Sequence, residues 1–351
     1  MDYKGKYSDV ISLLCSLIAT PSLSRNEGAA SNLIEEFLLE KGYSVNRCGN
    51  NVWVKSHSWD DSLPVVLLDA HVDTVAPQNG WTHEPFSASI EGERIYGLGA
   101  NDDGGSLVSL LQTFILWDEN GGNGKFNIIF SASAEEEVSG KNGIEESLKT
   151  MPEISFGLIG EPTGMEAAVA EKGLMVIDVT ETGVSGHAAR NEGVNALYKA
   201  VDDINWVRNH QFARVSPLLG EVKATVTIIN AGSTHNVIPA QCQFTIDVRS
   251  NECYSNEELF AEIQNGIQGK AKARSYRLNS SHADLNHPLL LRISELGIPQ
   301  FGSPTLSNQA LMQFPTVKIG PGQSSRSHSA DEYICISEIE EAVEIYSKIL
   351  Q

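Results

Sequence analysis

The 351-residue sequence predicts an α/β protein with a second domain inserted into its chain. Short apolar runs of strand length alternate with amphipathic helix patterns, as expected for an α/β sheet. Several of these runs end in a histidine or a carboxylate. A block at 174–281 has a different order of elements from the sequence on either side of it. These three observations predict the fold class.

The N-terminal part is expected to place two helices before the first strands. Apolar residues recur at three- and four-residue spacing in both helix patterns, and Gly42 supplies a stop for the second. A Gly-Asn-Asn turn joins the two strand-like runs that follow. The expected elements are helix 10–18, helix 33–38, strand 43–48 and strand 52–55.

Pro64–Pro77 contains the run on which the predicted site depends. Val65–Leu68 and then Ala70 form one short, buried strand, and His71 and Asp73 stand at its C-terminal end. An aspartate two residues after a histidine can orient the imidazole through its second nitrogen. An isolated His-x-Asp pair can equally be a solvated turn. The meaning of this pair therefore depends on the polar residues at other strand ends.

Asp102 and Asp103 lie in a glycine-rich turn, Tyr96–Gly105, before a helix with its apolar stripe at 107–115. Four glycines around the two acids indicate a sharply bent backbone that closely approaches another group. Such a turn could hold phosphate, but neither GxGxxG nor a GKS/T motif is present, and two aspartates would repel an anion. A bound metal ion accounts for the acids better.

Three further strands are followed by candidate site residues. Three adjacent glutamates are ordinarily a solvated surface, but directly after a buried strand they can supply one ligand and one general base. The last helix, 338–350, is expected to pack against the core. The strands and their residues are 126–137 with Glu135, Glu136 and Glu137, 156–163 with Glu161, and 315–319 with His328 in the loop beyond it.

The block at 174–281 is expected to form a self-contained domain. Its elements follow the order βαββαβ, which is the order of a split βαβ unit. The sequence thus predicts domains at 1–173 plus 282–351 and at 174–281. The expected elements of the block are strand 175–180, helix 194–209, strands 223–229 and 243–249, helix 256–268 and strand 273–278.

Composition excludes several classes of function. The formal charge of −20 argues against nucleic acid or an anionic membrane as a partner and suits metal ions or a cationic small substrate. Five scattered cysteines without CxxC spacing indicate neither a disulfide framework nor a thiolate zinc site. The first ten residues lack the profile of a signal peptide, and no apolar run approaches the roughly 20 residues of a membrane span. We expect a cytoplasmic protein.

The strand-end residues together predict a metal centre. Two histidines and several carboxylates, without cysteine, suit zinc, cobalt or manganese. A single catalytic zinc needs about three protein ligands, so this larger set favours two metals that share a carboxylate. The residues are His71, Asp102, one or two of Glu135 to Glu137, Glu161 and His328.

In this order the motifs resemble those of the co-catalytic zinc amidohydrolases, the family of acetylornithine deacetylase, succinyl-diaminopimelate desuccinylase, aminoacylase and glutamate carboxypeptidases. The resemblance covers essentially the whole chain. It implies a phosphorylase/hydrolase-like zinc-peptidase domain, with a mixed central sheet and helices on both faces, and an inserted ferredoxin-like lid and dimerisation domain. The motifs are DAHVDTVAP, YGLGANDD, AEEE, IGEPT, SGHAAR, HNVIPA, DVRS and SHSADEY.

The resemblance implies a role for each site residue. His71 and Glu161 would bind one zinc ion, Glu136 and His328 the other, and Asp102 would bridge the two. Glu135 would be the general base and acid, and Asp73 the partner of His71. The Asp102–Asp103 peptide would be cis. Because the family usually has a pair of glutamates here, the base and the ligand could instead be Glu136 and Glu137.

For the inserted domain, the resemblance implies a homodimer in which each subunit completes the other's site. His187 would reach the partner's site and stabilise the oxyanion, Asn236 would help bind substrate, and Arg249 would hold the substrate α-carboxylate. The residues alone fit equally well an exposed loop histidine, a strand cap and a surface charge at a strand end. The remaining histidines are expected at the surface without carboxylate neighbours: His57, His83, His210, His235, His282 and His287.

The sequence departs from the family pattern in two places. Many relatives carry a glycine-threonine-aspartate signature where this chain has FGSPTLSNQALM, 301–312, and Gly104 replaces a frequent lysine. Both changes are expected to affect specificity more than metal binding. A cation at the acyl pocket could distinguish acetyl from succinyl groups, with Arg326, Arg190 and Lys172 as candidates.

The predicted activity is hydrolysis of the amide bond of an N-acyl amino acid. The chain length and the IGEPT and HxxDEY motifs favour N-acetylornithine, or a related N-acyl-citrulline or N-succinylornithine, in arginine biosynthesis. Succinyl-diaminopimelate desuccinylase and dipeptidase are alternatives within the family. A non-catalytic binding protein on the same fold would be expected to lack a metal ligand, and this sequence keeps them all.

Overall fold

The computed structural model describes residues 5–190 and 192–351, which form two compact units. Unit 1 comprises 1–169, 283–301 and 307–351, and unit 2 comprises 170–282 and 302–306. Unit 2 thus begins four residues before the inserted domain expected from the sequence and includes a short return segment. Among the described residues, no helix is long and apolar enough to cross a membrane.

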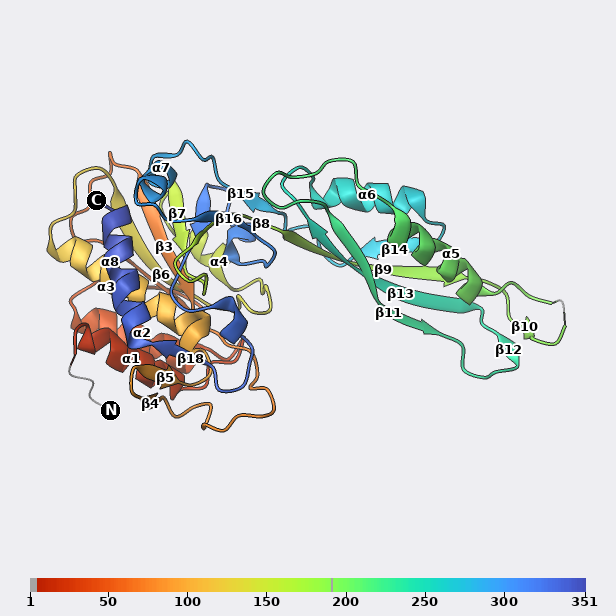
Figure 1. The fold of residues 1–351 in the computed structure, drawn as a ribbon, viewed down its shortest axis with the longest axis horizontal. Coiled ribbons are helices and arrows are strands. Elements are labelled where there is room, and N and C mark those ends of the chain that lie inside the picture. Colours follow the sequence, from red (N-terminus) through yellow and green to blue (C-terminus); the bar gives the residue numbers. More distant parts are fainter. Residues whose placement is uncertain (1–4, 191) are drawn as a thin grey trace. The chain divides into compact units, whose positions relative to one another are not determined.

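Unit 1 is built on a mixed sheet with the strand order β1-β2-β6-β3-β7-β17-β8. Its central strands β6, β3 and β7 are labelled next to one another in Figure 1. The central strands β6, β3, β7 and β17 are parallel, while β2 and β8 run antiparallel to their neighbours. The bounds are β1 (Asn46–Cys48), β2 (Asn51–Lys55), β3 (Val65–His71), β6 (Asn127–Ser133), β7 (Phe156–Ile159), β8 (Ala167–Glu171) and β17 (Thr316–Lys318).

Apolar clusters cover both faces of this sheet, so the expected α/β class is confirmed. Even-numbered residues of β3, such as Leu68, join the larger cluster with the first three helices and the last one, while Leu67 faces a smaller cluster with α4. This alternation follows from the two-residue period of a strand. The helices are α1 (Ser8–Ile18), α2 (Gly28–Glu40), α3 (Gly105–Glu119), α4 (Ile144–Leu148), α7 (Pro288–Glu295) and α8 (Ile336–Ile349).

The remaining elements of unit 1 are short. A three-stranded sheet in the order β18-β5-β4 lies outside the central sheet. The sequence did not predict it, because three-residue strands carry too little periodicity to be detected. The bounds are β4 (Ser89–Glu91), β5 (Arg94–Tyr96), β18 (Tyr333–Cys335), the π-helical turn η1 (Ala100–Gly104), and the 3₁₀ turns η2 (Asn308–Leu311) and η3 (Ser324–Arg326). Strand β16 (Gln300–Ser303) pairs with β8.

Unit 2 has a four-stranded antiparallel sheet in the order β11-β13-β9-β14, with α5 and α6 packed against it. This order is that of a ferredoxin-like split βαβ unit and confirms the expected fold. The bounds are β9 (Gly173–Thr182), β10 (Gly186–His187), α5 (Ala196–Asn209), β11 (Lys223–Ala231), β12 (Val237–Ile238), β13 (Gln241–Ser250), α6 (Asn256–Gly266), β14 (Lys270–Ala273) and β15 (Ser281–His282).

The position predicted for the last strand of unit 2, 273–278, is wrong. The strand is β14, Lys270–Ala273, with Lys270 opposite Thr180 of β9. Its Lys-Ala-Lys-Ala sequence has a weak apolar pattern. The more apolar Tyr276 packs against the core outside the ladder. Backbone pairing therefore selected a segment that side-chain hydrophobicity did not indicate.

Candidate metal centre

Three neighbouring parallel strands of unit 1 deliver polar residues to the same edge of the sheet. His71 is the last residue of β3, which lies between β6 and β7. Glu136 and Glu137 follow the end of β6, and Glu161 follows the end of β7. Since the carboxyl ends of parallel strands meet at one edge, these side chains converge, as expected for an α/β protein.

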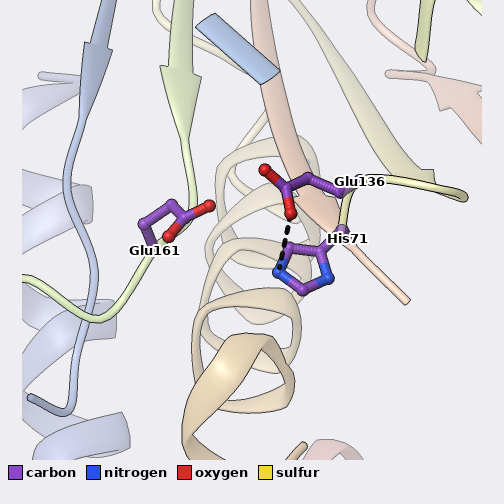
Figure 2. A group of neighbouring side chains, drawn as sticks. All are labelled: His71, Glu136 and Glu161. Atoms are coloured by element: carbon purple, nitrogen blue, oxygen red, sulfur yellow. Dashed lines mark ion pairs between the residues drawn. The ribbon is translucent and has the colours of Figure 1, made fainter. Parts of the chain in front are cut away.

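The first group of possible metal ligands consists of His71, Glu136 and Glu161, whose ligand atoms lie within 4.8 Å of one another. Figure 2 shows the two carboxylates approaching the imidazole from separate strand ends. Nε2 of His71 is 3.9 Å from a carboxylate oxygen of Glu136. One nitrogen and two oxygen donors are a suitable set for zinc, cobalt or manganese.

The second group consists of His71, Asp102 and Glu137, again within 4.8 Å of one another. His328 extends this group, because its Nε2 lies 3.0 Å from Glu137 and 3.6 Å from Asp102. Asp102 stands between the histidines: Oδ1 is 3.1 Å from Nε2 of His71, and Oδ2 faces His328. One oxygen toward each histidine is the arrangement of a carboxylate that can bridge two metal ions.

His71 is oriented by the backbone of the residue two positions on. Its Nδ1 lies 2.9 Å from the carbonyl oxygen of Asp73, so Nδ1 donates and the lone pair of Nε2 faces the centre. The carboxylate of Asp73 is 3.6 Å from the same nitrogen. It accepts the backbone N–H groups of Glu136 and Glu137, at 2.9 and 3.1 Å, and the hydroxyl of Ser24. Asp73 therefore also fixes the glutamate turn.

Asp102 is held by a carboxylate that the sequence did not single out. Glu332 is 2% exposed and accepts the backbone N–H groups of Asn101 and Asp102 at 2.8 and 2.9 Å. The side chain of Asn101 donates to the carbonyl oxygen of Gln323 and to Ser327, in the segment before His328. The Asp102–Asp103 peptide is cis, as expected. The sequence feature that could have pointed to Glu332 is its place in the SHSADEY motif, which also contains the candidate ligand His328.

The electrostatics of the centre favour bound cations. Burial and the repulsion of neighbouring carboxylates raise the pKa values of Glu136 and Glu161 well above the usual value. Burial opposes a charge on His71, but its contact with Asp102 and the carboxylates around it raise its pKa well above the usual value. The contact with Glu137 raises the pKa of His328 to about 8. Two divalent ions would balance this concentration of negative charge.

The structure does not bring Glu135 into either group of the described residues. Glu135 has a φ of 56°, and its carboxylate accepts the side-chain amide of Asn142 at 2.8 Å. Gly140 makes room for it, because a Cβ at that position would lie 1.8 Å from Oε2 of Glu135. The sequence favoured Glu135 as base and Glu136 as ligand, with Glu136 and Glu137 as the alternative pair, and this geometry supports the alternative.

The candidate residues of unit 2 lie on the β10–β12 ladder and on β13. His187 of β10 is exposed, and its Nδ1 accepts the backbone N–H of Ala189. Asn236 directly precedes β12, and its carbonyl oxygen accepts the N–H of Ala188. The structure thus brings the segments of His187 and Asn236 together. Arg249 of β13 makes a two-pronged contact with Asp247, at 2.8 and 3.2 Å.

Of the three cationic side chains that the sequence suggested for an acyl pocket, two contact other protein groups. Arg326 pairs with Glu338 at 2.8 Å and packs over the ring of Tyr333. The ammonium of Lys172 donates to the carbonyl oxygen of Glu221. Arg190 is exposed and lies 3.8 Å from a carboxylate oxygen of Glu192.

The prediction that the other histidines lack carboxylate neighbours is wrong for three of them. His57 pairs with Asp118, His83 with both Asp331 and Glu91, and His210 with Glu262. The partners of His57 and His210 are 61 and 52 positions away in the chain, so local sequence could not reveal them. His287 instead caps α7 through Nδ1 and stacks on Phe156.

Comparison with known proteins adds an independent line of evidence. A model of peptidase family M20/M25/M40 matches residues 67–351. Acetylornithine deacetylase of Edwardsiella ictaluri (strain 93-146) is 27% identical over 355 residues, which cover 92% of each chain.

Solved structures share the fold at low sequence identity. The Bacillus subtilis YXEP protein, described as a dinuclear metal binding peptidase from the M20 family, has a TM-score of 0.76 and is 18% identical, covering 98% of this chain and 97% of its own. A putative aminohydrolase from methicillin-resistant Staphylococcus aureus has a TM-score of 0.81 and is 15% identical, with coverages of 99% and 97%. At these identities the two structures support the fold alone.

Proposed function

We propose that this chain, which belongs to peptidase family M20/M25/M40, hydrolyses the amide bond of an N-acyl amino acid at a two-metal centre. Family membership makes it a metal-dependent amidohydrolase. The observation that carries the two-metal proposal is the position of Asp102, with one oxygen facing His71 and the other facing His328.

In this proposal His71 and Glu161 would hold one metal, Glu137 and His328 would hold the other, and Asp102 would be shared between them. The donor set suits zinc, with cobalt or manganese as substitutes. When bound, the two ions supply an acidified water and polarise the substrate carbonyl. Asp73 and Glu332 keep the protein ligands in position through the backbone hydrogen bonds described above.

We assign the general base to Glu136. Its side chain is 10% exposed, and its oxygen lies 3.9 Å from His71. Burial raises its pKa, which suits a carboxyl group that must take a proton near neutral pH and later release it. Glu136 would accept a proton from the attacking water and return it to the leaving amine. Glu135, which was expected from the sequence to be the base, would instead be a structural residue held by Asn142.

We further propose that unit 2 is the lid and dimerisation domain, through which two chains form a homodimer. β11 is an edge strand of its sheet, and Ile228 and Ile229 on it are 51% and 46% exposed. Tyr198 and Val201 on α5 are 70% and 44% exposed. An exposed apolar edge of this kind is suited to pairing with a second copy.

A second subunit would supply His187 to stabilise the oxyanion. His187 is exposed on a short ladder, so its ring is available to a group outside its own unit. Asn236, on the neighbouring segment, would contact the same substrate. Arg249 would release Asp247 and bind the α-carboxylate of the substrate instead.

Our leading substrate is N-acetylornithine, which places the enzyme in arginine biosynthesis. A curated relative with this activity in its name matches 92% of the chain, and the net charge of −20 suits a cationic side chain. N-acyl-citrullines, N-succinylornithine, succinyl-diaminopimelate and dipeptides are the competing substrates. We propose a cytoplasmic location, because all five cysteines are unpaired, as is usual in a reducing compartment.

The test is amine release by zinc- or cobalt-loaded protein from a panel of these compounds, with chelator-treated protein as the control. Metal-dependent release from N-acetylornithine would support the full proposal. Release from a succinyl compound or a dipeptide would keep the amidohydrolase assignment and replace the substrate. If no compound is hydrolysed by protein that binds two metals, the N-acyl amino acid assignment is contradicted.

A further inference from the structure

Beneath the metal centre, the strands β3 and β6 carry a second row of polar side chains. Ser133 pairs with His71 across the two parallel strands, and Asp69 lies two residues before His71. All three side chains therefore point to the same face of the sheet. Asp69 and Ser133 are both 0% exposed, and the Ser133 hydroxyl donates to Asp69 at 3.1 Å. Each lies only two to four residues before a proposed ligand or base.

A third residue, Asn308, closes this contact into a ring. Asn308 begins η2, and its side-chain amide donates to Oδ2 of Asp69 at 3.0 Å and to Oγ of Ser133 at 2.9 Å. It is 3% exposed. Two of the three hydrogen bonds in this ring join η2 to β3 and β6, although Asn308 lies 239 and 175 positions away from Asp69 and Ser133 in the chain.

We propose that Asn308 is a positioning residue that sets the spacing of the two strand ends and thereby the geometry of the metal ligands. This inference rests on the proposed function. His71 leaves β3 two residues after Asp69, and Glu137 leaves β6 four residues after Ser133. A shift of either strand end therefore moves a ligand, and ligand positions shifted by a fraction of an ångström weaken metal binding.

The direction of the hydrogen bonds suits an amide at position 308. The carboxylate of Asp69 can only accept, and the single hydroxyl hydrogen of Ser133 is donated either to Asp69, at 3.1 Å, or to the carbonyl oxygen of Ala70, at 3.4 Å. Asp69 and the Ser133 oxygen can each accept a further N–H donor, and the two N–H bonds of one amide supply both. This gives a role to the 301–312 segment, where the sequence departs from the family signature.

The test compares metal binding by four variants of the full chain, one of which, Asp69→Asn alone, is the reference for the double variant. Asn308→Leu removes both donors at similar volume. The double variant Asp69→Asn/Asn308→Asp reverses the donor and the acceptor and keeps the net charge. Gln309→Leu is the matched control, because Gln309 is an equally buried amide of η2 whose side chain contacts Thr316 of β17 instead. Zinc affinity is measured by competition with a chromophoric chelator, and ligand geometry by the visible spectrum of the cobalt-loaded protein.

We expect Asn308→Leu to weaken zinc binding by about 10- to 100-fold and to alter the cobalt spectrum. The double variant should restore both to within about 3-fold of the wild type, by remaking the hydrogen-bond ring. Gln309→Leu should lower the unfolding temperature without changing either readout.

Unchanged zinc affinity in folded Asn308→Leu would overturn the inference, as would a double variant that folds and binds no better than Asp69→Asn alone. If Asn308→Leu does not fold, the zinc affinity of the double variant relative to that of Asp69→Asn decides whether the inference holds. A wild-type protein that binds no metal would overturn the proposed function itself, so the two failures are distinguishable.

Discussion

The Nε2 atom of His328 lies 3.0 Å from both carboxylate oxygens of Glu137, although 191 positions separate the two residues. This contact selects one glutamate from three adjacent ones. It also places the loop after β17 against the turn after β6. The second metal position that we propose is defined by this pair and by Asp102.

We predict that Glu137→Gln lowers the bound metal from two ions to one, since a neutral amide is a poor replacement for a carboxylate ligand. Glu135→Gln should retain both ions, because an amide can still bond to Asn142. Metal content by elemental analysis of the two purified variants provides the measurement. Retention of two ions by Glu137→Gln, with loss in Glu135→Gln, would reverse the assignment.

We predict that Glu332→Gln weakens metal binding by about 10- to 100-fold, because the one oxygen of Glu332 that accepts both backbone N–H groups beside Asp102 becomes a neutral amide oxygen, which is a weaker acceptor. Zinc competition measures the effect. Asp118→Asn is the control, since Asp118 is also buried and accepts a backbone N–H, from His57. Equal metal affinities in the two variants would show that Glu332 contributes only to general stability.

The sequence was sufficient for the fold class, since apolar periodicity and element order predict the α/β sheet and the split βαβ unit. It also indicated the strand ends at which ligands gather. It favoured Glu135 and Glu136 as base and ligand, whereas we propose Glu136 and Glu137, because the positive φ of Glu135 and its contact with Asn142 cannot be read from the sequence. Asn308 and Glu332 were not predicted as functional, because their hydrogen-bond partners are between 175 and 239 positions away in the chain.

We predict that the stability of unit 2 depends on pH, because two acids lie next to each other in it, Glu181 of β9 and Asp203 of α5. Burial is the larger of two effects that raise the pKa of Glu181, and the contact with Asp203 is the second. Asp203 accepts two backbone N–H groups, from Gln268 and Gly269. The other charged or titratable groups that act on Glu181 are Lys199, whose ammonium bonds to the carbonyl oxygen of Thr182, and Cys242, opposite Glu181 on β13.

An acid whose pKa is raised by folding keeps its proton longer in the folded state, so stability falls as the pH rises from the ordinary glutamate value through the raised one. Glu181→Gln should therefore unfold at a higher temperature than the wild type at pH 8, by a few degrees, with no difference near pH 4. Asp178→Asn should show the opposite sign, since Arg274 lowers the pKa of Asp178. Thermal unfolding between pH 4 and pH 8 is the measurement, and a constant difference for Glu181→Gln would refute the coupling.

The proposed dimer predicts that Ile229→Lys, on edge strand β11, produces monomers. A charge at this exposed apolar position opposes pairing with a second strand. Leu39→Lys is the control, because Leu39 is similarly exposed on α2 of unit 1. Sedimentation of both variants and of the wild type measures the effect. Monomeric Ile229→Lys should also lose turnover, if His187 acts across the interface; full activity in a monomer would exclude that role.

The central claim is that Glu136 moves the proton at a centre whose metals are held by other residues. Its most direct test is turnover and metal content of Glu136→Gln, determined on the same preparation. We predict two bound metals, as in the wild type, and a loss of turnover of about 10²- to 10⁴-fold, the usual contribution of a general base. Loss of a metal ion, or turnover close to that of the wild type, would contradict the claim.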